Sequence, residues 1–573
     1  MDIFLIDAIG PFFRGYTKQR INWSKIPFQH LKTDPDQRRP QFNQIARDME
    51  LFAKRVSAVG YNAVSLDDVA HLAPDEWLEA EINITIGIFQ EEYRRLFSIL
   101  QSYGLRVYLT MDILSFTPLL KSMIGTSLGR ALQFLKRQLE TIFTTFDAID
   151  GIIFRIGECD GHDVRGDFKS ELFLRNAAEV NRLIRELLPL FEIHNRTMIL
   201  RTWTIGAYRI GDLVWHRDTT ARVLRGIDSP RFILSMKYGE SDFFRYLPLN
   251  NHFFTFKVRK IIELQARREY EGCGEFPSFV GWDYHQYAQQ LKHAENMAGI
   301  SVWCQTGGWV PFNRLSYLEP LAIWNELNSY VSLKLFKDGW SVEQAVASYC
   351  LEINCPDSGA MLELLKLDDS VIKELLYIKE VAQKKLFFRR VRIPSLLTVY
   401  WNNIFINHSS KIILLALVKN REETLREGEE ALRKIKRMKE IARELNLPEE
   451  DFEYMEDTFK LLALARRFYF LPDSEEERAA IKKAKLRYKK RYPRSFRPRY
   501  RIKTNYTPAP LSMNQLRLLI RFAVRSKRGY RIVDYLFTLH LLGTCYRMLA
   551  WVHPSMIPKF ARKQAMGIGT IFR

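Results

Sequence analysis

The sequence predicts an α/β fold, a (β/α)8 TIM barrel followed by an all-helical C-terminal region and a basic tail. From residue 3 to about residue 310, apolar runs typical of strands alternate with amphipathic helical patterns. There are eight such runs, which is the number of parallel strands that closes a barrel. After about residue 315 the pattern is helical only, and from residue 481 onward it is strongly basic.

The expected barrel strands are short apolar runs separated by longer segments with helical periodicity. The strands cover residues 3–6, 63–66, 107–109, 151–155, 198–201, 232–236, 260–264 and 300–304. The helices between them include residues 41–59, 90–103, 128–146 and 169–188, and the connection between the sixth and seventh strands has a weak helical signal. Parallel strands joined in this way bring their carboxyl ends to one rim, where barrel enzymes place their active sites.

Three domains are expected along the chain. They are the barrel (residues 1–315), a helical domain (316–475) and a basic, partly amphipathic helical tail (476–573). Within the helical domain, residues 422–445 combine many charges with spaced Leu, Ile and Met, which is typical of a helix packing on a bundle. The apolar stretch 516–552 contains Asp534 and Arg547, so we do not expect it to span a membrane.

The composition is that of a folded protein, because 47% of the 573 residues are hydrophobic and 13% are aromatic. The six cysteines form neither a disulfide framework nor a CxxC pair, which favours reduced thiols in a cytosolic protein. The first residues carry an acid where a signal peptide needs basic residues, so a cytoplasmic location is expected. No metal or organic cofactor is implied.

The net charge of +20 is concentrated at the C-terminal end. Residues 481–573 hold 23 Lys and Arg against one acid, whereas the first 480 residues hold 63 basic and 65 acidic residues. Such a tail can lie on an anionic membrane surface, bind nucleic acid or form a solvated charged face. We favour the membrane surface, which would make the protein peripheral on the inner membrane, because no nucleic-acid-binding motif accompanies the charge.

Two segments after successive strands hold most of the candidate chemistry. The first reads KYGESDF (residues 237–243), and the second reads ELQARREYEG (residues 263–272). Glycosidases need two carboxyl groups on opposite sides of the scissile bond, one protonated and one ionised. Aromatic rings stack on sugar faces, and Arg grips a carboxylate with two parallel hydrogen bonds. The mixture of acids, cations and aromatic residues therefore predicts a site for an acidic sugar.

The two segments resemble the α-glucuronidases of glycoside hydrolase family 67, in which K-[NY]-G-x-x-D-F precedes E-[LF]-Q-x-x-x-E-Y-x-G. The resemblance covers roughly residues 150–310. It implies inverting hydrolysis of terminal α-linked (4-O-methyl)glucuronic acid by a barrel with a helical C-terminal region. It also implies that Glu158 is the general acid, that Asp242 and Glu263 form the general-base pair, and that Lys237 and Arg201 hold the substrate carboxylate or ring hydroxyls.

Further side chains near the strand ends are candidates for contact with substrate. The full set of substrate-binding candidates is Arg155, Arg201, Trp203, Lys237, Arg267, Glu271, Trp303 and Trp309. Some alternatives stay open. Asp160 or Asp163 could replace Glu158 as acid, and ion pairing with the neighbouring arginines is the favoured role for at least one of Glu269 and Glu271. Asp283 is expected to be the N-cap of the following helix.

The favoured function is hydrolysis of an acidic-sugar glycoside in a membrane-linked glycan. The rival is a non-catalytic scaffold or carbohydrate-binding protein recruited to the membrane surface by its basic tail. Convergence of the three carboxylates Glu158, Asp242 and Glu263 would favour the enzyme. The helical region is expected to offer a homodimer surface.

Overall fold

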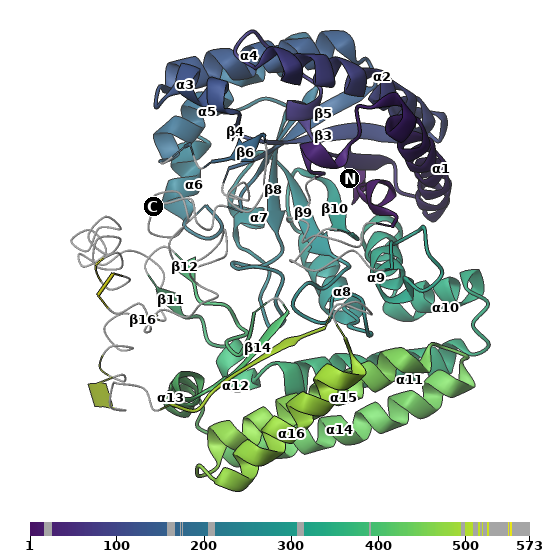
Figure 1. The fold of residues 1–573 in the computed structure, drawn as a ribbon, viewed down its shortest axis with the longest axis vertical. Coiled ribbons are helices and arrows are strands. Elements are labelled where there is room, and N and C mark those ends of the chain that lie inside the picture. Colours follow the sequence, from purple (N-terminus) through teal and green to yellow (C-terminus); the bar gives the residue numbers. More distant parts are fainter. Residues whose placement is uncertain are drawn as a thin grey trace.

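The computed structural model describes most of the chain. The described residues are 1–15, 26–156, 167–171, 173–174, 176–203, 213–305, 314–388, 391–400, 402–493 and 499–507, with short pieces at 514–515, 518, 524–525, 548 and 551–552. A barrel surrounded by helices stands against a layer of long helices from the C-terminal half (Figure 1).

Eight parallel strands close the barrel in the order β1-β10-β9-β8-β7-β5-β3-β2. They are β1 (Ile3–Asp7), β2 (Ala63–Leu66), β3 (Arg106–Asp112), β5 (Ile149–Arg155), β7 (Thr197–Arg201), β8 (Phe232–Lys237), β9 (Arg259–Gln265) and β10 (Met297–Trp303). Each coincides with one of the predicted strands, so the predicted barrel is confirmed.

Alternation along the strands builds the two apolar layers of the barrel. Ile3 and Leu5 belong to the cluster that fills the interior, whereas Phe4 and Ile6 join the larger core beneath the surrounding helices. The seam between β1 and β10 is tight at Gly299, where a Cβ would lie 1.7 Å from the Ile3 carbonyl oxygen. Only glycine allows the first and last strands to pair at this point.

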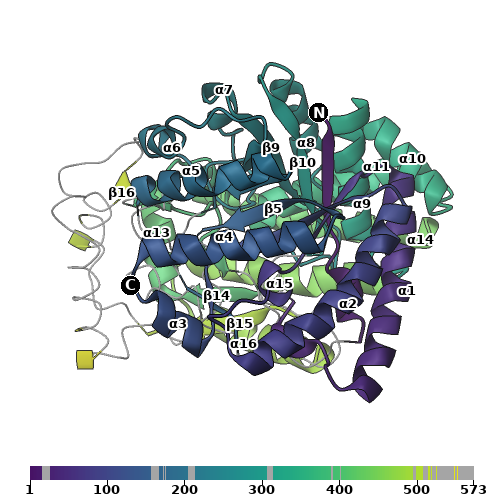
Figure 2. The ribbon, with the colours of Figure 1, turned by 90° about the horizontal axis from the view of Figure 1, so that it is seen from above.

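The helices around the barrel are α1 (Pro35–Val59), α2 (Ala80–Ser102), α3 (Pro118–Ile124), α4 (Leu128–Thr145), α5 (Ala177–Ile193), α6 (Arg217–Val223), α7 (His252–Thr255) and α8 (Gly281–Leu291). Figure 2 shows α1, α2 and α4 along their lengths. Five of the eight (α1, α3, α4, α5 and α6) start at a side chain that caps the helix. The helix expected from residue 169 is shorter than predicted. Asn176 caps α5 by accepting a hydrogen bond from Glu179 N at 3.0 Å, and Lys169–Ser170 instead forms β6, paired with β4 (Ser115–Phe116).

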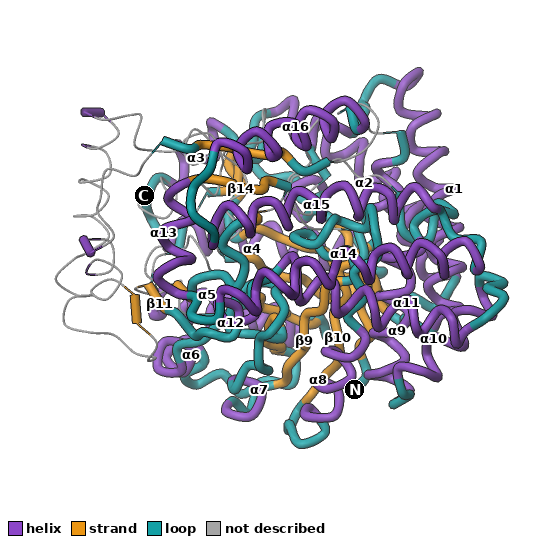
Figure 3. Tube along the Cα trace, turned by 90° about the horizontal axis from the view of Figure 1, so that it is seen from below, coloured by secondary structure: helices purple, strands orange, loops and turns teal. Residues whose placement is uncertain are grey.

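The C-terminal region is mainly helical, and its longest helices form one layer (Figure 3). The helices are α9 (Ile323–Leu333), α10 (Val342–Glu352), α11 (Ser358–Val371), α12 (Lys379–Ala382), α13 (His408–Leu417), α14 (Arg421–Glu444), α15 (Glu449–Phe470) and α16 (Glu475–Arg491). The predicted helix over residues 422–445 is confirmed as α14, which packs between α11 and α15.

The expectation of helices alone after residue 315 was wrong in part, because two small sheets interrupt them. One has the order β12 (Val391–Arg392), β11 (Phe387–Phe388) and β16 (Val524–Arg525), and the other has the order β13 (Val399–Tyr400), β14 (Asn403–Asn407) and β15 (Arg501–Asn505). Both sheets pair segments from the helical region with segments from the basic tail. Such short pairings between distant segments leave little periodic signal in the sequence.

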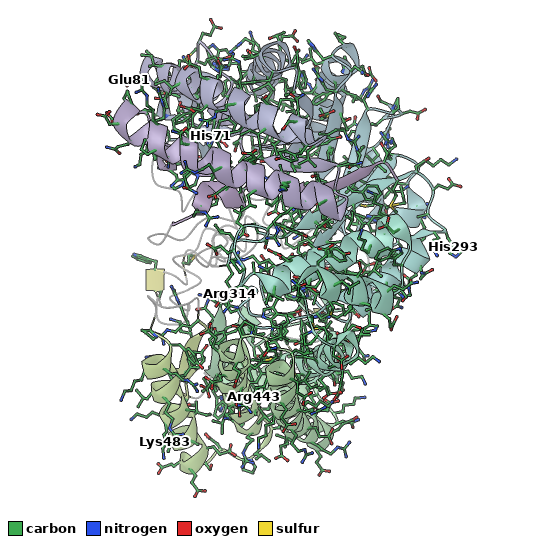
Figure 4. All side chains as sticks on the ribbon, turned by 90° about the vertical axis from the view of Figure 1, so that its right-hand side faces the viewer. His71, Glu81, His293, Arg314, Arg443 and Lys483 are labelled. Atoms are coloured by element: carbon green, nitrogen blue, oxygen red, sulfur yellow. The ribbon has the colours of Figure 1, made fainter. Side chains whose placement is uncertain are left out.

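The helical region packs on the rim formed by the carboxyl ends of the strands. Tyr500 Oη donates to the Tyr270 carbonyl oxygen (3.0 Å) and accepts from Gly272 N (2.9 Å), both just beyond β9. Arg314, which lies between the two halves in Figure 4, binds both carboxylate oxygens of Asp451 at 2.6 Å. Among the described residues, no helix is long and apolar enough to cross a membrane.

Candidate active site

Buried charges ring the carboxyl ends of the barrel strands. Arg155, the last residue of β5, lies 2.7 Å from the carboxylate of Asp112, the last residue of the neighbouring strand β3. Arg201 ends β7 and Lys237 ends β8, and each also faces an acid. Opposite charges held this close in a buried site attract each other strongly.

Glu263 on β9 is held rigidly by Arg201. The guanidinium donates from Nε to Oε1 (2.9 Å) and from Nη2 to Oε2 (2.8 Å), and Ser235 Oγ donates to Oε1 at 2.8 Å. Although burial alone would raise the pKa of Glu263, attraction to Arg201 and these hydrogen bonds lower it. Both oxygens of Glu263 thus accept hydrogen bonds from protein donors beneath the rim, and these contacts favour its ionised form.

Asp242 follows β8 and is bound by three donors. Lys237 Nζ lies 2.5 Å from Oδ1, Phe243 N donates to Oδ1 at 2.9 Å, and Tyr270 Oη donates to Oδ2 at 2.6 Å. Burial opposes ionisation of this carboxyl, but the charge of Lys237 and the three hydrogen bonds outweigh it and lower the pKa of Asp242. The Lys237 ammonium also sits over the Trp203 ring, 3.5 Å from its centroid.

The carboxyl of Glu269 has a raised pKa, in contrast to that of Asp242. It is 1% exposed, and neither of its oxygens has a hydrogen-bond partner among the described residues. Burial, together with repulsion from the neighbouring Asp242 carboxylate, raises the pKa of Glu269 to about 8, even though Lys237 acts in the opposite direction. The two acids therefore hold different protonation states at neutral pH. Environments that push the pKa values of adjacent carboxyls apart are typical of acid–base sites.

The chain reaches this arrangement through a tightly coiled segment. Arg268, Gly272, Cys273 and Gly274 all have positive φ, so residues 266–274 turn back over the end of β9. Glu269 thereby comes to lie beside Asp242, although it is six residues beyond Glu263 in the same sequence motif. Ion pairing was favoured for at least one of Glu269 and Glu271, because nothing in the residue pattern indicates where this coil directs the Glu269 side chain.

Glu271 has a structural role, because its carboxylate ties this segment to neighbouring arginine and tyrosine side chains. Its carboxylate accepts from Arg268 Nη2 (2.6 Å), from Tyr377 Oη (2.7 Å) and from Arg245 Nε (3.1 Å), which confirms the expected ion pairing. With these donors occupying a fully buried carboxylate, we assign Glu271 to the junction with the helical region. Asp283 was expected to cap α8 but lies within its first turn, because its side chain pairs with Arg245 at 3.0 Å.

The two aromatic candidates that the structure describes, Trp203 and Trp303, are buried. Trp303 is 5% exposed and packs its ring under the Arg201 guanidinium, 4.6 Å from the ring centroid. Trp203 is 4% exposed and Arg267 is 1% exposed. The Trp303 indole nitrogen has no hydrogen-bond partner among the described residues, which makes it an available donor at the end of β10.

Four candidates fall outside the described residues. They are Glu158, with its alternatives Asp160 and Asp163, and Trp309. The structure therefore places Asp242, Glu263 and the cations that bind them in one cluster, and it adds Glu269 to this cluster.

Comparisons with known proteins gave matches to solved structures only. No protein-family model and no curated protein matches this chain. One matching structure is a GH138 enzyme targeting pectin rhamnogalacturonan II, with 8% identity, a TM-score of 0.48 and coverage of 86% of this chain. This chain spans 62% of the length of that enzyme.

Two further matches are less similar in structure. An O-GlcNAc hydrolase from Thermobaculum terrenum has 11% identity, a TM-score of 0.36 and coverage of 77% of this chain and 85% of its own. A β-mannanase from the blue mussel Mytilus edulis has 15% identity, a TM-score of 0.32 and coverage of 59% of this chain and 94% of its own. The barrel itself is established by the strand pairing described above.

Proposed function

We propose that this protein is a glycoside hydrolase that cleaves the glycosidic bond of an acidic sugar such as α-glucuronic acid, with inversion at the anomeric carbon. The observation that supports it best is the pair of adjacent buried carboxyls with opposed pKa shifts, Asp242 lowered and Glu269 raised to about 8. The motifs around them add support for an acidic sugar.

In the proposed reaction, Asp242 is the general base. It accepts a proton from a water molecule as the water oxygen bonds to the anomeric carbon. Glu158, the general acid that the resemblance implies, gives its proton to the glycosidic oxygen as that bond breaks. Protonated Glu269 lies beside Asp242 and prevents the repulsion that two adjacent carboxylates would create.

Glu263 acts in this proposal through Arg201 as a positioning residue. Its two-point contact with the guanidinium fixes a cation beside the reacting sugar. The carboxyl that neighbours Asp242 in this proposal is therefore Glu269 and not Glu263. Lys237 keeps Asp242 ionised and rests on Trp203.

The test is hydrolysis of matched aryl glycosides. Purified protein would be given aryl α-D-glucuronide and aryl α-D-glucoside, alongside Asp242→Asn and a surface control, Arg437→Gln, on the exposed side of α14. We expect release from the glucuronide by wild type and the control, and a fall of about 10²- to 10⁴-fold for Asp242→Asn. No release from any acidic-sugar glycoside by correctly folded protein would overturn the enzyme and favour a scaffold.

We also propose that the enzyme works at an anionic membrane surface. Support comes from α16, where a run of basic side chains is exposed and Leu486 among them is 58% exposed. The exposed basic residues are Lys482, Lys483, Arg487, Lys489 and Lys490. Lys483 lies at the end of the molecule opposite α1 and α2 (Figure 4). Each basic residue near an anionic bilayer contributes about 1 kcal/mol.

A further inference from the structure

A hairpin from the C-terminal region returns to the barrel. Strands β11 and β12 pair antiparallel, with Phe387 opposite Arg392, and β16 from the basic tail adds on the other side of β11. In Figure 1 the hairpin lies between α6 of the barrel and the helical layer. Two segments far apart in the sequence, the hairpin and a short piece of the tail, thus pair beside the barrel.

The hairpin connects to the active-site cluster through aromatic rings. The ring centroids of Phe387 and Trp215 are 4.7 Å apart, and both residues pack in one buried cluster with Trp203. Trp203 in turn lies under the Lys237 ammonium that binds Asp242. A continuous series of contacts, through Trp215, Trp203 and Lys237, therefore links the hairpin to the proposed general base.

The side chain of Arg392 is a buried cation to which no described acid is hydrogen-bonded. It is 2% exposed, its Nη1 lies 3.7 Å from Glu240 Oε2, and neither Nε nor Nη1 has a hydrogen-bond partner within the part of the chain that the structure describes. Lys385 Nζ is 4.0 Å from the same Glu240 oxygen, so two cations face one carboxylate. Burial lowers the pKa of Arg392 to about 10, and burial together with Arg392 lowers that of Lys385.

The barrel cations differ from Arg392 in this respect. Arg201 donates two hydrogen bonds to Glu263, and Lys237 binds Asp242, so both already serve acids of the protein. A buried guanidinium with unused donors is costly, and its planar fork matches the two oxygens of a carboxylate. Glu240, its only charged neighbour within 4.0 Å among the described acids, is two residues before Asp242, which places Arg392 at the edge of the same loop.

We propose that Arg392, with Lys385 beside it, binds the carboxylate of the acidic sugar and so determines the substrate specificity of the barrel. This assignment rests on the proposed function. It gives the C-terminal region a direct part in the site, because the residue that recognises the acid comes from a hairpin outside the barrel. In this assignment Arg201 and Lys237 bind Glu263 and Asp242 and are not needed to bind the carboxylate of the sugar.

The test measures the binding of D-glucuronate, D-glucose and inorganic phosphate by calorimetry. The full chain would be compared with Arg392→Gln, the charge-preserving Arg392→Lys and the surface control Arg437→Gln. We expect wild type and the control to prefer glucuronate over glucose by about 10- to 100-fold, Arg392→Gln to lose this preference and Arg392→Lys to regain part of it. Circular dichroism would confirm that each variant is folded.

Three results would overturn the assignment of Arg392. Preference for glucuronate that survives in Arg392→Gln, or no preference in wild type, overturns the assignment. Phosphate bound as well as glucuronate and lost with it would show a general anion site and would also overturn it. Failure of the hydrolase proposal is separate. In that case wild type releases no sugar from the aryl glycosides, while the effect of Arg392→Gln on glucuronate binding remains.

Discussion

Replacement of Glu269 by Gln should make the protein more stable at alkaline pH than wild type. The carboxyl has an ordinary pKa of 4.5 in the unfolded chain and a pKa of about 8 in the folded protein. Between these values the folded state binds a proton that the unfolded state has lost. Since stability falls with rising pH wherever the folded state binds more protons, Glu269 lowers the stability of the fold progressively as the pH rises from about 4.5 to about 8.

The expected size follows from the same two pKa values. Linkage gives a slope that approaches 1.36 kcal/mol per pH unit below the folded pKa and flattens near it. From pH 6 to pH 8, wild type should therefore lose about 2 kcal/mol of unfolding free energy relative to Glu269→Gln. Other groups that titrate in this range, such as Asp368 with a pKa of about 8, are present in both proteins and cancel.

The assay is denaturant unfolding of both proteins at pH 6, 7 and 8. Asp368→Asn is the matched control, because it removes a second buried acid with a similar pKa that lies in the helical region. It should reduce the pH slope by a similar amount without changing the pH profile of hydrolysis. For wild type, kcat/KM should fall above about pH 8 as Glu269 ionises. Parallel stability curves for wild type and Glu269→Gln would refute the raised pKa and the pairing with Asp242.

Three other variants test separate parts of the site and surface. Asp242→Asn should lower kcat about 10²- to 10⁴-fold with little change in KM, measured by steady-state kinetics. A variant in which KM rises while kcat is unchanged would contradict the role of Asp242 as base. Glu263→Gln leaves Arg201 without its acid and should cost about 3–5 kcal/mol in denaturant unfolding, whereas a loss under 1 kcal/mol would argue against the buried pair. The double variant Lys489→Glu/Lys490→Glu should weaken sedimentation with phosphatidylserine vesicles by about 10-fold or more while leaving hydrolysis of soluble glycosides unchanged, and unchanged sedimentation would argue against the membrane surface.

The barrel was predictable because each strand leaves a local signal. Alternating apolar runs and helical periodicity located all eight strands, and the acids that follow β8 and β9 could be assigned to one rim. The two sequence motifs also predicted that Asp242 and Glu263 lie in one site. Lys237 and Arg201 were expected to hold the substrate, and the structure shows that they bind Asp242 and Glu263.

The rest depends on contacts that the sequence pattern does not encode. The position of Glu269 depends on several residues with positive φ between β9 and α8, only two of which are glycines. The hairpin that contains Arg392 is four residues of strand paired with two residues of the tail, too short for a periodic signal. The composition of the tail favoured a membrane-binding surface but gave no sign that β16 pairs the tail with the hairpin.

The stereochemistry of product release tests the central claim most directly. Aryl α-D-glucuronide would be hydrolysed in an NMR tube, and the first anomer of glucuronate released by wild type and by Asp242→Asn would be recorded by proton NMR. The account predicts that wild type releases the β-anomer before mutarotation and that Asp242→Asn releases almost none. Release of the α-anomer first, or equal release by both proteins, would contradict it.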